Sequence, residues 1–159
     1  MKIYIVFFIL LFITNSALAQ NIPKIKTADL IKMIDTSSSP LVINFWATWC
    51  RPCVAELPIL EKNVAEMNAS GIKLILINLN FPNDYINLRS FVQTHEYKSQ
   101  IFWLDENNLS MFFSSINKRW AGTIPATLMI NNAKQYREFY GYGLAEYQIQ
   151  AYLKDLIGR

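Results

Sequence analysis

Cys50 and Cys53 are the two cysteines of this 159-residue chain, and only Arg51 and Pro52 separate them. Two thiols at this spacing can form and break a disulfide by thiol–disulfide exchange. A purely structural bridge is a weaker interpretation, because a loop this short removes little entropy from the unfolded chain. The spacing therefore predicts a redox-active pair.

Other uses of a C-x-x-C pair need partners that this chain does not supply. A structural zinc site takes four ligands, and the chain offers two cysteines and one histidine. Covalent haem attachment requires a histidine after the second cysteine, where Val54 stands. A catalytic cysteine–histidine pair would have to use His95, which lies in a polar stretch and is predicted to be exposed. We therefore expect no metal.

The residues around the pair predict a strand that leads into a helix. Residues 41–46 form an apolar run interrupted by Asn44, as in a buried strand, and a long helix is predicted from near Cys50 to before Gly71. The positive end of a helix lowers the pKa of a thiol placed there. Side chains three positions apart on a helix are about 5–6 Å apart at Cβ, close to disulfide reach.

The two sulfurs are not expected to be equivalent. Cys53 belongs to an apolar stripe at helical spacing, which continues through Leu57, Leu60, Val64 and Met67. This predicts a buried Cys53 that resolves mixed disulfides and an exposed Cys50 that attacks. Arg51 either stabilises the Cys50 thiolate or is an ordinary solvated charge, and Pro52 fits in the first helical turn.

The rest of the chain predicts one mixed sheet with helices on both faces. Thr27 is a candidate helix N-cap, and residues 20–26 form an extended lead-in. Helices are predicted at 28–36, 84–96, 109–118 and 144–157, and strands at 72–79, 101–104, 127–130 and 136–140.

The first residues have a composition of their own. A positively charged start precedes an apolar run at 3–13, and Ala17 and Ala19 supply the small residues of a cleavage site. The alternative is a permanent membrane anchor, although a spanning helix needs about 20 apolar residues. We therefore expect a signal peptide at 1–19 and one domain at 20–159, which works in the periplasm or elsewhere outside the cytoplasm. A net charge of +3 without basic runs predicts no nucleic-acid partner.

Two motifs carry a resemblance to a known superfamily. Residues 44–53 read NFWATWCRPC and are followed by ELP at 56–58, and residues 123–127 read TIPAT. In combination they resemble the thioredoxin superfamily, most closely its TlpA/ResA-like extracytoplasmic thiol–disulfide oxidoreductases. The resemblance implies an α/β, thioredoxin-like three-layer sandwich, with the helix and strand insertion of that branch at 80–118.

The resemblance also implies roles for individual residues. Ile124 and Pro125 would be joined by a cis peptide bond facing the cysteines, where the backbone of Ile124 pairs with substrate. Trp49, Arg51 and Pro52 would complete the substrate-binding surface. Trp46 would lie nearby, although core packing is the simpler interpretation for it.

Two further positions define the branch. Glu56 would face the cysteines as a catalytic carboxylate, its alternative being an exposed helix position. Asn44 stands where thioredoxin has a buried aspartate, which shifts the proton-handling role toward Glu56. Many members of the branch begin with an extra hairpin, which this sequence does not predict.

The implied function is reduction of disulfides in extracytoplasmic proteins, including cytochrome c biogenesis. A membrane electron-relay protein would be the donor, the protein would be a monomer, and its only redox group would be the Cys50–Cys53 pair, without a cofactor. The alternatives are a disulfide oxidase or isomerase, and a binding or chaperone module in which the dithiol is a redox-sensitive latch.

Overall fold

The structure is a computed structural model that describes residues 22–158, so the predicted signal peptide at 1–19 lies outside the described residues. Its strands form one mixed sheet in the order β1-β4-β3-β2-β5-β6. Strands β1 to β4 run parallel, β5 is antiparallel to β2, and β6 is antiparallel to β5. The strands are β1 (Lys24–Ile25), β2 (Leu41–Trp46), β3 (Lys73–Asn78), β4 (Gln100–Leu104), β5 (Ala126–Asn131) and β6 (Tyr136–Tyr140).

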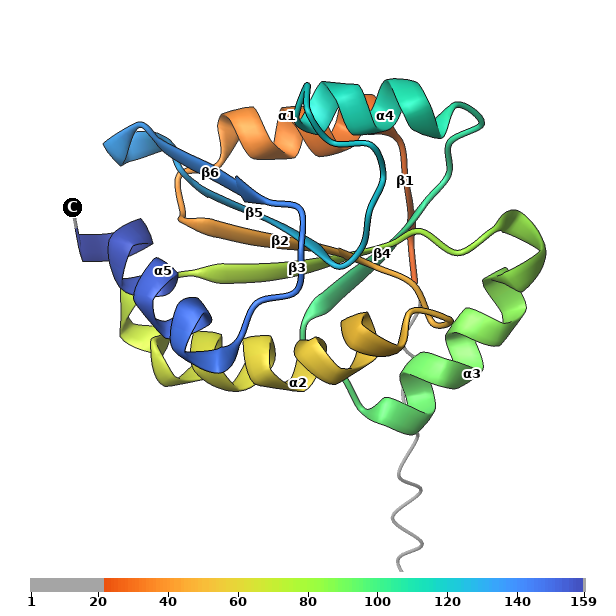
Figure 1. Ribbon diagram of the computed structural model, residues 1–159, viewed down its shortest axis with the longest axis horizontal. Coiled ribbons are helices and arrows are strands. Elements are labelled where there is room, and N and C mark those ends of the chain that lie inside the picture. Colours follow the sequence, from red (N-terminus) through yellow and green to blue (C-terminus); the bar gives the residue numbers. More distant parts are fainter. Residues whose placement is uncertain (1–21, 159) are drawn as a thin grey trace, which may run out of the picture.

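Helices cover both faces of this sheet and complete three layers (Figure 1). One face carries α1 (Thr27–Thr36) and α4 (Leu109–Ile116), and the other carries α2 (Arg51–Glu66), α3 (Tyr85–His95) and α5 (Glu146–Gly158). The predicted thioredoxin-like sandwich is confirmed, and the insertion between β3 and β5 consists of α3, β4 and α4 with a short 3-10 turn at Pro82–Asp84.

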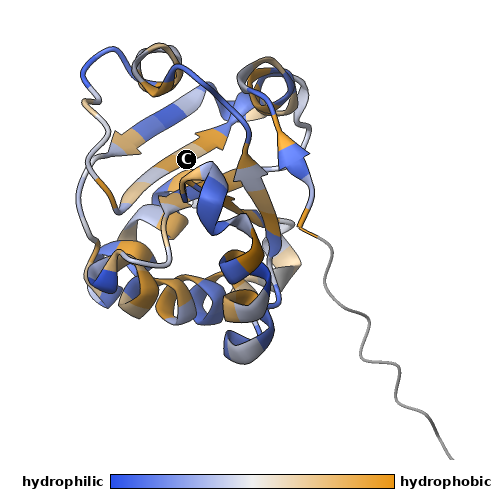
Figure 2. Ribbon diagram, turned by 90° about the vertical axis from the view of Figure 1, so that its right-hand side faces the viewer, coloured by the Kyte–Doolittle hydropathy of each residue, from blue (hydrophilic) through white to orange (hydrophobic). Residues whose placement is uncertain are grey.

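The sheet divides the interior into two cores. Along β2, Val42 and Trp46 point into the core beneath α2, whereas Ile43 and Phe45 point into the core beneath α1 and α4. All six residues of β2 are buried, because helices cover the strand on both sides. Figure 2 shows hydrophobic residues along the inner strands and alternating hydropathy along the helices. Trp46 is therefore a core residue.

The register places three loops at one edge of the sheet. Parallel pairing sets Trp46 opposite Asn78, so the loops that follow β2 and β3 leave the sheet side by side. Antiparallel pairing sets Ala126 opposite Phe45, so the segment before β5 arrives at the same edge. Residues from distant parts of the sequence therefore meet around the start of α2.

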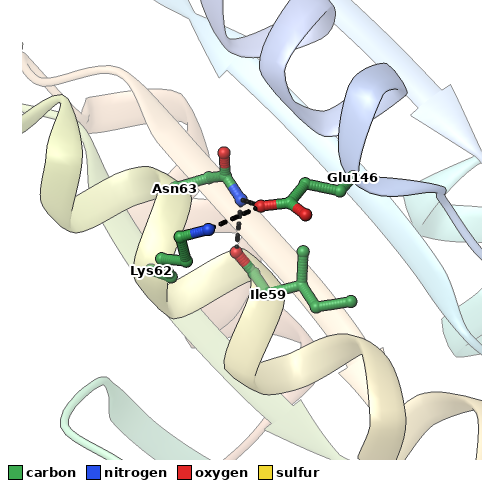
Figure 3. A network of polar contacts seen from close by, with 4 residues as sticks. All are labelled: Ile59, Lys62, Asn63 and Glu146. Atoms are coloured by element: carbon green, nitrogen blue, oxygen red, sulfur yellow. Dashed lines mark hydrogen bonds and ion pairs between the residues drawn. The ribbon is translucent and has the colours of Figure 1, made fainter.

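Helix α5 is joined to α2 by a small polar network (Figure 3). Glu146 Oε1 accepts hydrogen bonds from Lys62 Nζ at 2.9 Å and from Asn63 Nδ2 at 3.3 Å. The same Asn63 amide donates to the carbonyl of Ile59 at 2.8 Å. The lysine–glutamate pair is exposed, so it contributes little energy, but the buried Asn63 sets the position of the helix start.

Two local predictions need correction. Thr27 does not cap α1 but is its first residue, and its backbone N–H donates to Glu106 Oε1 at 2.7 Å, so a distant carboxylate supplies the cap. Helix α2 ends at Glu66, earlier than predicted, because a 3-10 turn at Asn68–Ser70 intervenes before Gly71, which has φ +70°. Within residues 22–158 no helix is long and apolar enough to cross a membrane.

Candidate active site

The two cysteines form a disulfide at the N-terminus of α2. Cys50 is the N-cap residue and Arg51 begins the helix, with 5.3 Å between the Cα atoms of Cys50 and Cys53. The backbone N–H of Cys53 donates to Cys50 Sγ at 3.3 Å. The sulfur of Cys50 therefore occupies the place that a capping oxygen takes in other helices, facing free N–H groups and the positive end of the helix dipole.

The observed difference in burial between the two cysteines is smaller than predicted. Cys53 is fully buried, as predicted, but Cys50 is only 6% exposed, so the prediction of an exposed Cys50 is wrong for the disulfide form. The sulfur of Cys50 turns inward because it is bonded to Cys53 and accepts the Cys53 N–H. Cys50 nevertheless remains the more accessible of the two.

Glu56 lies one turn after Cys53 and is 5% exposed, which excludes the alternative of a solvated helix carboxylate. Its Oε1 accepts from Asn44 Nδ2 at 3.0 Å, and its Oε2 accepts from the backbone N–H of Leu144 at 2.7 Å. Burial raises the pKa of Glu56, and these two hydrogen bonds oppose part of that rise. The carboxyl group can therefore hold a proton at a higher pH than an exposed glutamate.

Asn44 joins Glu56 to the sheet. Its Nδ2 also donates to Thr127 Oγ1 at 3.0 Å, so one amide group connects β2, α2 and β5. Its Oδ1 is buried and has no hydrogen-bond partner among the described residues. The amide supplies a hydrogen bond to the carboxylate without adding a second buried charge, which an aspartate at this position would do.

The third loop at the site contains Pro125, and the Ile124–Pro125 peptide bond is cis, as the resemblance implies. Gly143 packs against this loop and against Glu56. A Cβ atom at Gly143 would lie 3.4 Å from both Glu56 Oε2 and Pro125 Cγ. The absence of a side chain at this position lets the 141–144 segment approach closely enough for Leu144 to bind the carboxylate.

On the β3 side of the disulfide, two loops are hydrogen-bonded to each other. The backbone N–H of Thr48 donates to Asn80 Oδ1 at 2.9 Å, and Asn80 Nδ2 donates back to Thr48 Oγ1 at 2.8 Å. Asn78 Nδ2 donates to Asn80 Oδ1 at 3.1 Å, and the Asn80 N–H donates to Asn78 Oδ1 at 3.0 Å. The indole of Trp103 donates to the Asn80 carbonyl at 2.9 Å. We call the Thr48–Asn80 pair the clamp.

The remaining predicted site residues lie on the outer surface of this edge. Trp49 is 57% exposed and its ring stacks on Phe81, with centroids 6.4 Å apart and planes 15° apart. Arg51 and Pro52 occupy the first turn of α2 and are exposed. His95 is exposed on α3, as predicted, and its ring stacks on that of Phe91.

Several residues of this site were not predicted. Asn78 is the last residue of β3, Asn80 and Phe81 follow that strand, and Gly143 and Leu144 follow β6. An Asn-Leu-Asn sequence at the end of an apolar run was the available signal, since asparagine side chains at turns often hydrogen-bond the backbone two residues further on. No group of three or more His, Cys, Asp or Glu side chains suited to a metal ion occurs among residues 22–158.

Fold and site together define a thioredoxin-like domain whose helix-capping disulfide can carry out dithiol–disulfide exchange. The family model described as AhpC/TSA matches residues 16–138, so the chain belongs to the AhpC/TSA family.

A similar protein is the thiol-disulfide oxidoreductase ResA of Halalkalibacterium halodurans, 23% identical over 124 residues. The match covers 78% of this chain and 66% of that relative, slightly under two thirds of its length.

Solved structures share the fold. A thioredoxin-related protein of Neisseria meningitidis serogroup B superposes with a TM-score of 0.65 at 20% identity, covering 77% of this chain and 88% of that one. A thiol:disulfide interchange protein of Chlorobium tepidum TLS gives a TM-score of 0.63 at 18% identity, covering 76% and 81%. These likenesses establish the thioredoxin-like fold.

Proposed function

We propose that this protein is an extracytoplasmic thiol–disulfide oxidoreductase that reduces disulfides in other proteins through Cys50 and Cys53. One observation carries the proposal: the Cys50–Cys53 disulfide caps α2, and a buried carboxylate, Glu56, lies one turn further along the same helix. The first feature favours a thiolate, and the second supplies a group that can exchange protons inside the site.

The reaction begins from the reduced protein. The Cys50 thiolate attacks a substrate disulfide, forms a mixed disulfide and releases the first substrate thiol. Cys53 then attacks the Cys50 sulfur and releases the second substrate thiol, so two electrons pass to the substrate and the Cys50–Cys53 disulfide forms. Cys53 is fully buried and must lose its proton to attack, and Glu56 is the residue that we assign to accept it.

What surrounds the cysteines supports the reducing direction. Strong oxidants stabilise their thiolate heavily, and the residues between these cysteines are an exposed arginine and a proline. Glu56 opposes a second negative charge next to it, which raises the pKa of the cysteine pair. Weaker thiolate stabilisation means a weaker oxidant, so we expect a potential nearer about −270 mV than about −120 mV.

The location and partners are part of the same proposal. The signal-like sequence at 1–19 supports export, and the relatives named thiol-disulfide oxidoreductase ResA support the exchange chemistry. In that compartment the reduced form must be regenerated, for which we propose a membrane electron-relay protein. Apocytochrome c cysteines, which must be reduced before haem is attached, are a suitable substrate class.

Trapping of mixed disulfides tests the exchange chemistry. Cys53→Ser should accumulate covalent adducts with a disulfide substrate such as insulin, because Cys50 attacks and no resolving thiol remains. Cys50→Ser should accumulate none, and the unchanged protein should reduce insulin catalytically with a dithiol donor. Adducts on both variants would contradict the assignment of Cys50, and no insulin reduction would favour a binding or chaperone module.

A redox titration against glutathione or dithiothreitol at neutral pH tests the direction. A potential below about −230 mV supports a reductase, and one above about −180 mV, in the isomerase and oxidase range, would favour the oxidase alternative.

A further inference from the structure

Next to Trp49, which the resemblance places in the substrate-binding surface, lies Phe81, a residue to which neither the motifs nor the relatives assign a role. The rings of Trp49 and Phe81 stack on each other, and both are largely exposed, at 57% and 60%. Single exposed apolar residues are normal on protein surfaces, but two stacked rings form a continuous apolar patch. We call this pair the aromatic platform.

The platform is held in place by the clamp. Each ring directly follows a clamp residue, since Trp49 follows Thr48 and Phe81 follows Asn80. Two hydrogen bonds of 2.9 and 2.8 Å join Thr48 to Asn80, and Asn80 itself is buried. Beyond Phe81, its carbonyl accepts the Asp84 N–H at 2.9 Å, and Pro82 restricts the chain. The rings therefore keep their relative position without help from a bound partner.

Position relative to the disulfide indicates what the platform binds. Trp49 immediately precedes Cys50, so a partner whose sulfur is bonded to Cys50 brings its own neighbouring residues over the two rings. An extended chain advances about 3.3 Å per residue, so side chains within two or three residues of the partner's cysteine are in reach. Preorganised aromatic rings lose little conformational entropy on binding and gain most from an apolar or aromatic side chain.

We propose that the Trp49–Phe81 platform is a docking surface that selects polypeptide substrates with an aromatic or large aliphatic residue close to the reacting cysteine. This inference rests on the proposed function and adds Phe81 as a specificity-determining residue. The clamp residue Asn80 positions Phe81 against Trp49.

Two synthetic peptides with one intramolecular disulfide test it, identical except for Phe or Ser two residues before the first cysteine. The second-order rate constant for oxidation of the reduced protein is measured for each. The Phe peptide should react roughly tenfold faster than the Ser peptide. In Phe81→Ala this ratio should fall below about threefold, and Phe81→Tyr, which keeps an aromatic ring, should retain it.

The matched control is Met111→Ala. Met111 is 70% exposed on α4, in the layer on the opposite face of the sheet from α2 (Figure 1), and its replacement should leave the ratio at the unsubstituted value. Thermal unfolding of each variant checks that the fold is intact, as expected for exposed positions.

The outcomes separate the two proposals. Equal rates for the two peptides, or an unchanged ratio in Phe81→Ala, would overturn the docking surface and leave the oxidoreductase function standing. Reaction with neither peptide would overturn both. If the rings instead bind a second copy of this chain, sedimentation would show a concentration-dependent dimer that Phe81→Ala abolishes, and that result would also overturn the assignment to substrate.

Discussion

On the β5 side of the disulfide the buried polar groups include a carboxylate, Glu56, whereas on the β3 side they are the neutral amides of Asn78 and Asn80. Both sides are well hydrogen-bonded, and both meet the active-site helix or the loop that leads into it. They differ in whether they can change charge. Glu56 can gain or lose a proton within an accessible pH range because burial raises its pKa, and the amides cannot.

This difference suggests a division of tasks around one pair of sulfurs. The carboxylate side is suited to adjusting the reactivity of Cys53, which lies one turn away on α2. The amide side is suited to fixing geometry, because its hydrogen bonds stay the same at any pH where the fold persists. Substitutions on the two sides should therefore differ in pH dependence as well as in size.

The largest effect on stability is expected from Asn80→Ala. The substitution removes the partner of the Thr48 N–H, the Thr48 hydroxyl and the Asn78 amide, and it leaves a buried space. The free energy of unfolding should fall by about 2–3 kcal/mol in urea titrations. The loss should be the same at pH 5 and at pH 8, because no ionisable group is removed.

Asn87→Ala is the control for that experiment, since Asn87 is an exposed residue of α3. Its replacement should change stability by less than about 0.5 kcal/mol. A loss in Asn80→Ala no larger than this would show that the clamp contributes little, and a loss that varies with pH would remove the contrast between the two sides.

A smaller effect with a distinct pH dependence is expected from Glu56→Gln. Because the pKa of Glu56 is raised in the folded state, the folded protein binds more protons than the unfolded chain between about pH 4.5 and that raised pKa. The free energy of unfolding of the unsubstituted protein should therefore fall as pH rises through this window. Glu56→Gln should lose this slope, so the variant gains relative stability from pH 4 to pH 8.

Glutamine fits this position because the amide of Asn44 can rotate. The Oδ1 atom of Asn44, which has no hydrogen-bond partner among the described residues, would then accept a hydrogen bond from the amide group of the new glutamine. The variant should also lower the pKa of the cysteine pair, measured by the pH dependence of thiol alkylation in the reduced protein. Glu66→Gln, at an exposed position of the same helix, is the control, and an equal slope in both variants would contradict the prediction.

The smallest effect is expected from Gly143→Ala. The added methyl group would sit 3.4 Å from Glu56 Oε2 and from Pro125 Cγ, a contact that the loop can accommodate with a small shift. Stability should fall by less than about 1 kcal/mol. Because the methyl group further excludes water from the carboxylate, the pKa of Glu56 should rise, which carboxyl NMR titration would detect.

Gly158→Ala is the control for that measurement, because a Cβ at Gly158 meets no atom within 4 Å. It should leave the titration of Glu56 unchanged. A lower pKa of Glu56 in Gly143→Ala would indicate that the loop moves away and admits water.

Features that depend on local order could be predicted from the sequence. The apolar run at β2 had to be a strand covered on both faces, and the cysteines had to lie at the following helix start, because spacing and hydrophobic periodicity act over a few residues. The resemblance carried by the motifs at 44–53 and 123–127 predicted the superfamily and the cis peptide bond before Pro125. Element ends were less accurate, as at Thr27 and Glu66, since distant groups and turns set them.

The groups that surround the sulfurs could not be predicted in this way, because they come from distant parts of the sequence. Glu56 and Leu144 are 88 residues apart, Asn44 and Thr127 are 83 apart, and Thr48 and Asn80 are 32 apart. Contacts over such separations depend on strand register, which brings the ends of β2 and β3 and the start of β5 to one edge. The stacking of Phe81 on Trp49 depends on the same register, because no local pattern encodes which loops will be neighbours.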